Sequence, residues 1–374
     1  MIKLLIVIPT LDQSGAEKQF ALLASRLPST EFQVQVAVLT RGGPFEAMLQ
    51  TSEIPYAILQ KRWRLDPITV LKVRREIQKF QPDVVLSGLF SANSTVRLAT
   101  WGMTRPPAIM ISERCVDSWK SRWQLWLDRR LQQRTQQLVA NSASVREFYA
   151  DTGFPREKIC VIPNGVAVPE RPAMSRQEFC SQLKLPADAR LSMFVGRLAA
   201  QKQLKCLIWA IQLLRQSDPR AYFLIAGDGP EREELEFYAR DVEAISHVRF
   251  LGHRPDAAAL LHHCDVFWLA SVFEGMSNSL MEAMACGKPV IVSDIPPNRE
   301  LVRHGVDGYL INVGDSAGFS QYSERLFQDD ALATRLGEAG RSRMAEEFSI
   351  EKMVQRYAES IRQAASNRQC EQGE

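Results

Sequence analysis

The sequence predicts an α/β protein built on parallel sheets, and two observations lead to this prediction. Short apolar runs recur along the chain, and between them apolar residues are spaced as they are on one face of a helix. An alternation of strands and helices throughout a chain is typical of α/β proteins with parallel sheets. With 374 residues, the chain has the length of two or three domains.

The predicted strands of the first half cover residues 2–9, 33–40, 54–59, 81–88, 108–111 and 138–140. Those of the second half cover residues 191–195, 222–227, 248–251, 266–270 and 289–292. A proline or glycine follows many of these runs, where it ends a strand and begins a turn. From about residue 331 the apolar spacing becomes helical.

The composition excludes several classes of protein. No run of eighteen apolar residues is present, so we expect no membrane span. The opening apolar run is too short for a signal peptide and is better interpreted as a first buried strand. The seven cysteines are scattered without a C-x-x-C pair, which supports neither a zinc site nor a disulfide framework. We therefore expect a cytoplasmic protein.

Charge is distributed unevenly along the chain. Residues 1–180 carry 24 Lys and Arg against 16 Asp and Glu, whereas the remainder carries 22 against 27. We expect the basic first half to contact an anionic partner, but we do not expect that partner to be a nucleic acid. The cations between residues 61 and 79 form either a solvated helix face or a surface for anionic lipid.

A second segment leaves two interpretations open. Trp119, Trp123 and Trp126 recur at helical spacing among several arginines. Such a stripe is either part of the core or the apolar face of an interfacial helix that lies on the inner face of the cell membrane.

Residues 273–290 concentrate the chemistry of the chain, in the order strand end, glycine turn, short helix and next strand. The short polar residues 277–279 crowd the helix start, where backbone N–H groups and the helix dipole favour an anion. Glu274 precedes this helix and Glu282 follows about one turn into it, which suits a nucleotide sugar. Ser279 and Glu282 also match a capping box, which is the alternative interpretation.

The same stretch resembles a known signature. Glu274 and Glu282 are separated by seven residues and followed by Ala-Met-Ala-x-Gly-x-Pro-Val, as in the retaining family-4 glycosyltransferases of GT-B fold. The resemblance implies that Glu274 approaches the donor sugar and that Glu282 binds the ribose hydroxyls. It also implies that backbone N–H groups between them hold the sugar and diphosphate, namely those of Gly275, Met276, Ser277, Asn278 and Ser279.

Two cations follow a predicted strand at Gly196-Arg197-Leu198 and Lys202. An apolar strand that delivers Arg and Lys five residues apart into a loop suits a clamp on two phosphates. The family motif Gly-Arg-Leu…Lys-Gly matches here, except that Gln203 replaces its final glycine. We expect Arg197 and Lys202, together with Glu274, to be the catalytic residues.

Three further glycines match the donor site of the family. Gly227 and Gly229 form a turn in which backbone meets the nucleotide. Gly15 lies in the first loop, which in the family faces the diphosphate, although Ser14 replaces the glycine that usually precedes it. This loop is neither G-x-G-x-x-G nor a Walker motif.

The acceptor side is less clearly marked. Many family members carry a histidine after the fourth strand, but all five histidines of this chain lie between residues 247 and 304. Asn93 and Glu113 are the nearest polar substitutes. The triplet Ser112-Glu113-Arg114 resembles the subgroup that extends glycans on polyprenyl-diphosphate carriers.

The resemblance implies two Rossmann-like domains facing across a cleft. We expect an acceptor domain at residues 1–166, a donor domain at residues 167–349, and a C-terminal helix at 350–374 that crosses back to the first domain. The predicted reaction is retaining transfer of a hexosyl or N-acetylhexosaminyl unit from a UDP-sugar to a lipid-linked glycan in surface polysaccharide biosynthesis. No Asp-x-Asp motif is present, so neither a metal nor another cofactor is expected.

Two other classes of function have less support in the sequence. An NAD-dependent or epimerase-type Rossmann enzyme lacks support because G-x-G-x-x-G is missing. A non-catalytic sugar-nucleotide binding module is disfavoured because Arg197, Lys202, Glu274 and Glu282 are all present.

Overall fold

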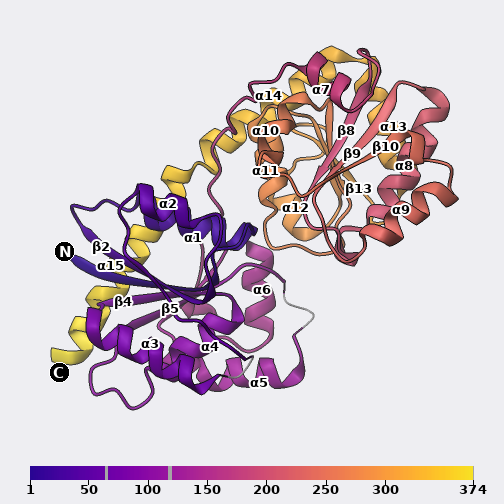
Figure 1. Cartoon of the computed structure of the whole chain (residues 1–374). Coiled ribbons are helices and arrows are strands. Elements are labelled where there is room, and N and C mark those ends of the chain that lie inside the picture. Colours follow the sequence, from indigo (N-terminus) through magenta and orange to yellow (C-terminus); the bar gives the residue numbers. More distant parts are fainter. Residues whose placement is uncertain (64–65, 117–119, 374) are drawn as a thin grey trace. The chain divides into compact units, whose positions relative to one another are not determined.

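The chain forms two compact units. The computed structural model describes residues 1–63, 66–116 and 120–373. Unit 1 comprises Met1–Gly165 together with the segment that begins at Ile350, and unit 2 comprises Val166–Ser349 (Figure 1). Arg64 and Trp119, which were part of the predicted basic cluster and tryptophan stripe, lie outside the described residues.

Unit 1 contains a seven-stranded parallel sheet in the order β3-β2-β1-β4-β5-β6-β7. Its strands are β1 (Ile2–Thr10), β2 (Phe32–Arg41), β3 (Tyr56–Ile58), β4 (Val84–Gly88), β5 (Ala108–Glu113), β6 (Gln137–Ala140) and β7 (Ile159–Val161). Both faces of the central strands are buried, because side chains alternate between two separate apolar clusters.

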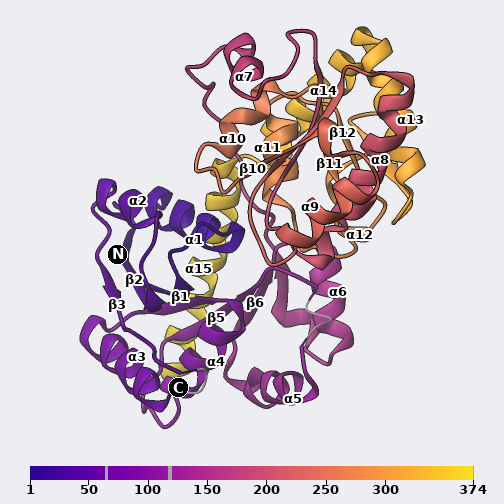
Figure 2. The same ribbon diagram turned by 45° about the vertical axis from the view of Figure 1, so that its right-hand side comes forward.

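Helices cover both faces of this sheet. They are α1 (Gly15–Arg26), α2 (Glu46–Thr51), α3 (Pro67–Phe80), α4 (Leu89–Ala99), α5 (Arg122–Leu131), α6 (Ala143–Asp151) and α15 (Ile350–Gly373), with short 3-10 turns η1 (Gln132–Arg134) and η2 (Arg156–Lys158). One cluster contains buried residues of α1 and α15, and the other contains buried residues of α3, α4 and α6. Figures 1 and 2 show α3, α4 and α5 along the same side of the unit.

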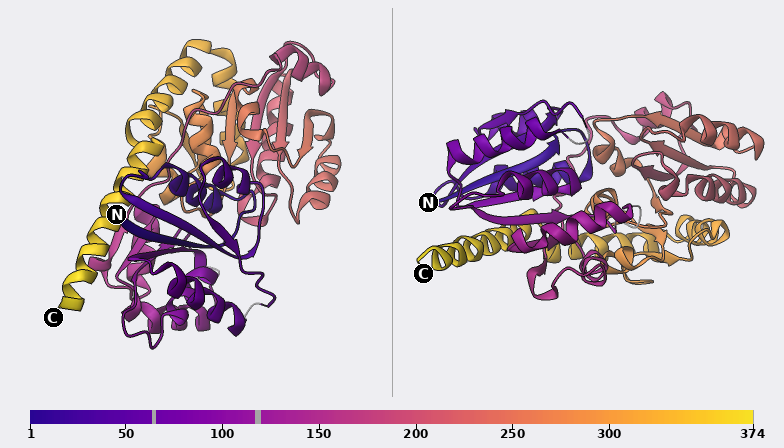
Figure 3. Two further views of the ribbon diagram at one scale, coloured as in Figure 1. Left: turned by 60° about the vertical axis from the view of Figure 1, so that its left-hand side comes forward. Right: turned by 90° about the horizontal axis from the view of Figure 1, so that it is seen from below.

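The last helix, α15, is built into unit 1 although it follows unit 2 in sequence. Met353, Tyr357 and Ile361 are buried against strands of unit 1. Arg362 forms a bidentate pair with Glu31, with N–O distances of 2.5 and 2.9 Å. The first strand and the last helix therefore belong to the same unit (Figure 3).

Unit 2 contains a six-stranded parallel sheet in the order β10-β9-β8-β11-β12-β13. Its strands are β8 (Arg190–Val195), β9 (Ala221–Ala226), β10 (Val248–Gly252), β11 (Val266–Leu269), β12 (Val290–Ser293) and β13 (Tyr309–Ile311). Its helices are α7 (Arg176–Gln182), α8 (Leu204–Ser217), α9 (Arg232–Asp241), α10 (Ala257–Leu260), α11 (Asn278–Ala285), α12 (Pro296–Leu301), α13 (Ser316–Gln328) and α14 (Asp330–Glu347), with 3-10 turns η3 (Ala200–Lys202), η4 (Ile245–His247) and η5 (Leu261–His263).

Each unit has the strand order of a Rossmann fold. The order reverses beside β1 in unit 1 and beside β8 in unit 2, where the next strand along the sheet is β4 or β11. Open parallel sheets bind ligands at the carboxyl ends of the strands at such a reversal. The predicted α/β class with two Rossmann-like domains is confirmed.

The structure decides between the two interpretations of the tryptophan stripe for two of its members. Trp123 and Trp126 are 44% and 58% exposed, so the interpretation of these residues as core is wrong. Within the described chain, no helix combines the length and apolarity needed to cross a membrane.

Candidate functional site

The loops after β8 and β11 meet at the strand reversal of unit 2. Val266 of β11 pairs with Ser192 of β8, so the carboxyl ends of these strands lie side by side. Beyond them, the backbone N–H of Val272 donates to the carbonyl of Gln201 at 2.9 Å. This bond connects the loop that carries the predicted cations to the loop that carries Glu274.

Lys202 and Glu274 form an ion pair across these two loops. The Ser271 hydroxyl donates a second hydrogen bond to the Glu274 carboxylate at 2.7 Å. The side chains of Lys202 and Glu274 are 15% and 10% exposed, so the pair is shielded from bulk water. Two of the three predicted catalytic side chains are therefore in direct contact, and Ser271 is a partner that the sequence analysis missed.

The departure from the family motif at Gln203 has a structural explanation. Gln203 adopts the left-handed conformation, with φ of 51°. Glycine takes this conformation without steric cost, whereas other residues take it less often. The chain thus keeps the turn that follows Lys202 without the glycine that usually forms it.

Arg197 differs from Lys202 in its surroundings. It lies directly after β8, is exposed, and makes no ion pair with the described residues of the chain. An exposed guanidinium in the loop that also carries Lys202 is able to bind an anionic ligand in bidentate fashion.

The start of α11 is capped by Ser277, whose hydroxyl accepts a hydrogen bond from the Leu280 N–H at 3.4 Å. Ser279 therefore lies inside the helix, and the alternative in which Ser279 and Glu282 cap the helix is wrong. Glu282 is 8% exposed and lies in the second turn. The remaining N–H groups of the first turn are those that a helix start offers to an anion.

The glycines of the predicted donor site allow close backbone packing. Gly196 and Gly227 have φ of 156° and 149°, and a Cβ at Gly227 would lie 1.8 Å from the Gly196 carbonyl oxygen. A Cβ at Gly229 would lie 2.3 Å from the carbonyl oxygen of Leu198. These residues hold the loop after β9 against the loop that carries Arg197.

In unit 1, the loop after β1 presents a buried carboxyl group. Gly15 begins α1, and Glu17 accepts hydrogen bonds from the Ser14 hydroxyl and from Thr10 Oγ1, the latter at 2.9 Å. Burial raises the pKa of Glu17 above its usual range, against the lowering effect of the Thr10 hydrogen bond. The sequence analysis did not select Glu17, although an acidic residue in the first turn after a glycine loop was a visible signal.

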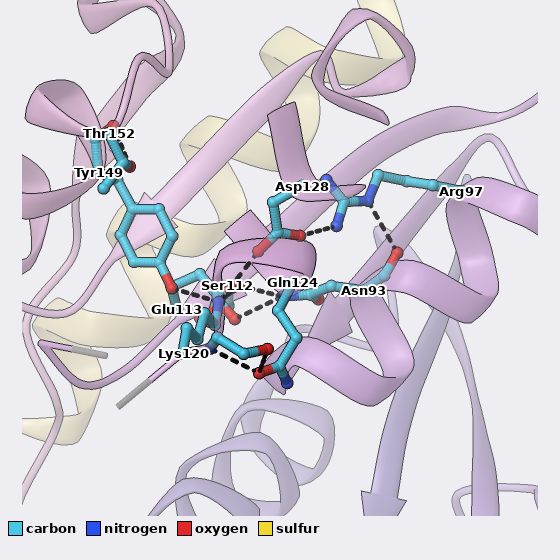
Figure 4. A network of polar contacts seen from close by, with 10 residues as sticks. Asn93, Arg97, Ser112, Glu113, Lys120, Gln124, Asp128, Tyr149 and Thr152 are labelled. Carbon is cyan, nitrogen blue, oxygen red and sulfur yellow. Dashed lines mark hydrogen bonds and ion pairs between the residues drawn. The ribbon is translucent and has the colours of Figure 1, made fainter. Parts of the chain in front are cut away.

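The predicted acceptor residues Asn93 and Glu113 belong to a buried polar network (Figure 4). The Asn93 amide donates to Glu113 Oε1 at 3.0 Å and to the Ser112 carbonyl at 3.1 Å. Lys120 Nζ lies 3.3 Å from Glu113 Oε1 and 3.1 Å from Asp128 Oδ2. Lys120 and Asp128 were not among the predicted site residues, because the network also depends on Arg97 and Tyr149, which lie 31 and 29 positions away from Asp128 and Lys120.

Arg114 is also buried rather than presented to solvent. Its guanidinium donates to Asn164 Oδ1 and to the Tyr357 hydroxyl of α15, the latter at 3.4 Å, and lies over the Phe20 ring. The three residues predicted for the acceptor side are therefore at most 9% exposed, and the structure brings them together within the interior of unit 1.

No three His, Cys, Asp or Glu side chains gather to hold a metal ion in the described part of the chain.

The family described as Glycosyltransferase Family 4 matches residues 13–168. The family described as Glycosyl transferases group 1 matches residues 175–343. The chain belongs to these glycosyltransferases. Its membership favours this class over the NAD-dependent alternative.

The chain is similar in sequence to two curated glycosyltransferases. It is 32% identical over 224 residues to the lipopolysaccharide core biosynthesis glycosyltransferase LpsE of Rhizobium meliloti (strain 1021). This match covers 60% of this chain and 63% of LpsE. It is 32% identical over 215 residues to the UDP-Gal:alpha-D-GlcNAc-diphosphoundecaprenol alpha-1,3-galactosyltransferase of Escherichia coli. This second match covers 56% of this chain and 54% of the galactosyltransferase. The chain thus spans less than two thirds of the length of either relative.

Solved structures support the fold of the glycosyltransferase. The crystal structure of Anabaena HepE in complex with UDP-glucose has a TM-score of 0.86 at 23% identity, and the match covers 97% of this chain and 100% of HepE. At this identity the likeness shows the GT-B fold.

Proposed function

We propose that this glycosyltransferase transfers a hexosyl or N-acetylhexosaminyl unit from a UDP-sugar to a lipid-linked glycan acceptor, with retention of anomeric configuration. The observation that carries the proposal is the Lys202–Glu274 ion pair, with exposed Arg197 in the loop that carries Lys202 and the start of α11 following Glu274. This arrangement provides positive charge, the N–H groups of a helix start and a carboxylate at one strand reversal, which are the groups that a nucleotide diphosphate sugar requires.

The departing UDP determines what the cations do. As the bond between the sugar and the β-phosphate breaks, negative charge grows on the phosphate oxygens. Arg197, Lys202 and the first N–H groups of α11 would stabilise this charge, and such preorganised donors contribute most at the transition state. Because cations take this role, the proposal includes no metal ion.

Glu274 connects the phosphate and sugar parts of the site. Its carboxylate is already oriented by Lys202 and by the Ser271 hydroxyl. A carboxylate fixed in this way can accept hydrogen bonds from sugar hydroxyls without reorganisation. Glu282, one turn into α11, is assigned to the ribose hydroxyls. The retaining course follows the family pattern, in which the leaving phosphate accepts the proton of the attacking acceptor hydroxyl and no carboxylate nucleophile is needed.

The choice of substrates rests on the relatives and on one motif. The galactosyltransferase of E. coli is named for a UDP-sugar donor and a diphosphoundecaprenol acceptor, and HepE was solved with UDP-glucose. The triplet Ser112-Glu113-Arg114 is consistent with a carrier-linked acceptor. Its side chains are interior, so they would shape the acceptor surface and not contact the glycan directly.

Substitution of the two cations tests the proposed clamp. We expect Arg197→Ala and Lys202→Ala each to lower kcat by about 10²–10³, because each removes a group that meets the growing phosphate charge. The measurement is UDP release from UDP-sugars, with and without lipid-linked acceptor. Lys205→Ala, a change in an exposed lysine of α8 that pairs with Glu234, is the control and should leave kcat unchanged. Rates within tenfold of the parent for both Arg197→Ala and Lys202→Ala would contradict the clamp.

A further inference from the structure

Helix α5 is inverted relative to an ordinary surface helix. Its residues Gln124 and Asp128 are 4% and 9% exposed, whereas Trp123 and Trp126 are 44% and 58% exposed. A helix on the surface of a globular protein normally buries its apolar side chains and exposes its polar ones. In α5 the side chains of Gln124 and Asp128 face the interior of unit 1, whereas the two tryptophans face outward.

The inward face of α5 is held by buried charges. Asp128 accepts from Arg97 at 2.5 Å through one oxygen and from Lys120 at 3.1 Å through the other (Figure 4). The Arg97 and Lys120 side chains are fully buried, and Lys120 also donates to the Tyr149 hydroxyl at 2.6 Å. This network fixes the rotation of α5 about its axis, because any other rotation would strand these charges in the interior.

The exposed tryptophans are part of a larger surface. The guanidinium of Arg130 lies 5.6 Å from the Trp126 ring centre, and that of Arg134 lies 4.2 Å from the ring centre of Trp101, which is 59% exposed. Arg74 of α3 donates to the Trp101 carbonyl at 2.6 Å. The tryptophan face is the surface formed by Trp101, Trp123, Trp126, Arg129, Arg130 and Arg134.

The charge of this surface is of one sign. Arg129 and Arg130 are exposed beside the tryptophans, and Asp128 is buried and bonded to two cations. Helix α3, whose Arg74 contacts the Trp101 carbonyl, also exposes Leu71 (57%) and the cation Arg75. Large apolar side chains on a monomer surface mark a contact site, and the surrounding cations indicate that the contacted surface is anionic.

We propose that the tryptophan face binds the surface of a bilayer containing anionic lipids. Tryptophan rings settle at the level of lipid head groups, and neighbouring arginines interact with the negative surface potential. Several flexible cations around flat aromatic rings fit a fluid anionic surface better than a protein partner, which would need carboxylates matched in position. The inference does not rest on the proposed function.

Vesicle flotation tests this proposal with the whole protein. We expect binding to phosphatidylglycerol–phosphatidylcholine vesicles, loss of binding as salt is raised, and little binding to phosphatidylcholine alone. The double substitution Arg129→Gln with Arg130→Gln should weaken partitioning roughly tenfold or more, since each cation near such a surface contributes about 1 kcal/mol. Trp123→Ala with Trp126→Ala should weaken it comparably.

Matched changes in unit 2 provide the controls. Trp209→Ala removes a tryptophan of α8 that is 40% exposed, and Lys184→Gln with Arg335→Gln removes two exposed cations. Both should bind vesicles as the parent does. Circular dichroism and donor hydrolysis should be unchanged in every variant, which separates this proposal from the proposed reaction. The proposal is overturned if the parent does not bind anionic vesicles, if binding is insensitive to these substitutions, or if the tryptophan changes instead abolish self-association of the parent.

Discussion

At the scale of single residues, burial governs the ionisation of Glu17. Its pKa is raised because the carboxylate form is poorly solvated, even though two hydroxyl groups donate to it. A carboxyl group whose pKa is raised in the folded state binds protons more tightly there than in the unfolded chain. Its favourable contribution is therefore fully present below the ordinary pKa of 4.5, and it is lost as the pH rises through the folded-state value.

This sign gives a prediction for Glu17→Gln. The free energy of unfolding of the parent should fall relative to that of the variant as the pH rises above 4.5, because only the parent must ionise a buried group. Urea unfolding at several pH values between 4 and 8 measures the difference. Glu157→Gln, at an exposed position of unit 1, serves as the matched control. A difference between parent and Glu17→Gln that is independent of pH would contradict the prediction.

At the scale of elements, the positions of the strands could be predicted from the sequence better than the orientation of α5, that is, which of its faces is buried. The predicted runs at 2–9 and 191–195 correspond to β1 and β8 with shifts of at most one residue at an end, whereas the run predicted at 81–88 begins three residues before β4. Such strands are apolar on both faces, so their signal is local. The orientation of α5 is not local, because Arg97 and Tyr149, which hold its polar face, are distant in sequence. Tryptophans at helical spacing look the same whether the helix faces inward or outward.

In the candidate site, too, the features encoded in one contiguous stretch could be predicted, and those that depend on distant residues could not. Residues 273–290 carry a donor-site signature within one contiguous stretch, so their arrangement as turn, helix and strand could be predicted. The contact of Lys202 with Glu274 spans 72 positions and depends on β8 and β11 being neighbours. The buried Glu113 carboxylate accepts from both Asn93 and Lys120, and the spacing of residues gave no signal for Lys120.

The buried network that anchors α5 makes a prediction about stability. Lys120→Met should destabilise unit 1 by about 3–5 kcal/mol, because it leaves the Glu113 and Asp128 carboxylates without their shared cation. Adding Glu113→Gln to Lys120→Met should recover part of the loss, because Lys120 is the cation beside the Glu113 carboxylate, whereas Asp128 keeps its pair with Arg97. Urea denaturation of the single and double variants measures both effects. A double variant less stable than Lys120→Met by the full cost of Glu113→Gln alone would show that the two residues are not coupled.

At the scale of the whole molecule, the two units differ in how the chain builds them. Unit 2 is one continuous segment, Val166–Ser349, with a single apolar cluster of its own. Unit 1 needs a segment from the other end of the chain, because α15 completes the cluster on one face of its sheet. The order of strands is the same around β1 and β8, so this difference lies in the last helix and not in the sheets.

This difference predicts how fragments behave. A fragment of residues 166–349 should unfold cooperatively on heating, whereas a fragment of residues 1–165 should not. The latter loses the buried side chains Met353, Val354, Tyr357 and Ile361. Burial of each such side chain contributes about 1.5–3 kcal/mol, and four together approach the whole stability of a domain, about 5–15 kcal/mol. Adding a peptide of residues 350–373 to the 1–165 fragment should restore a cooperative transition in circular dichroism. If the 1–165 fragment unfolds cooperatively without the peptide, α15 is not required for the core of unit 1.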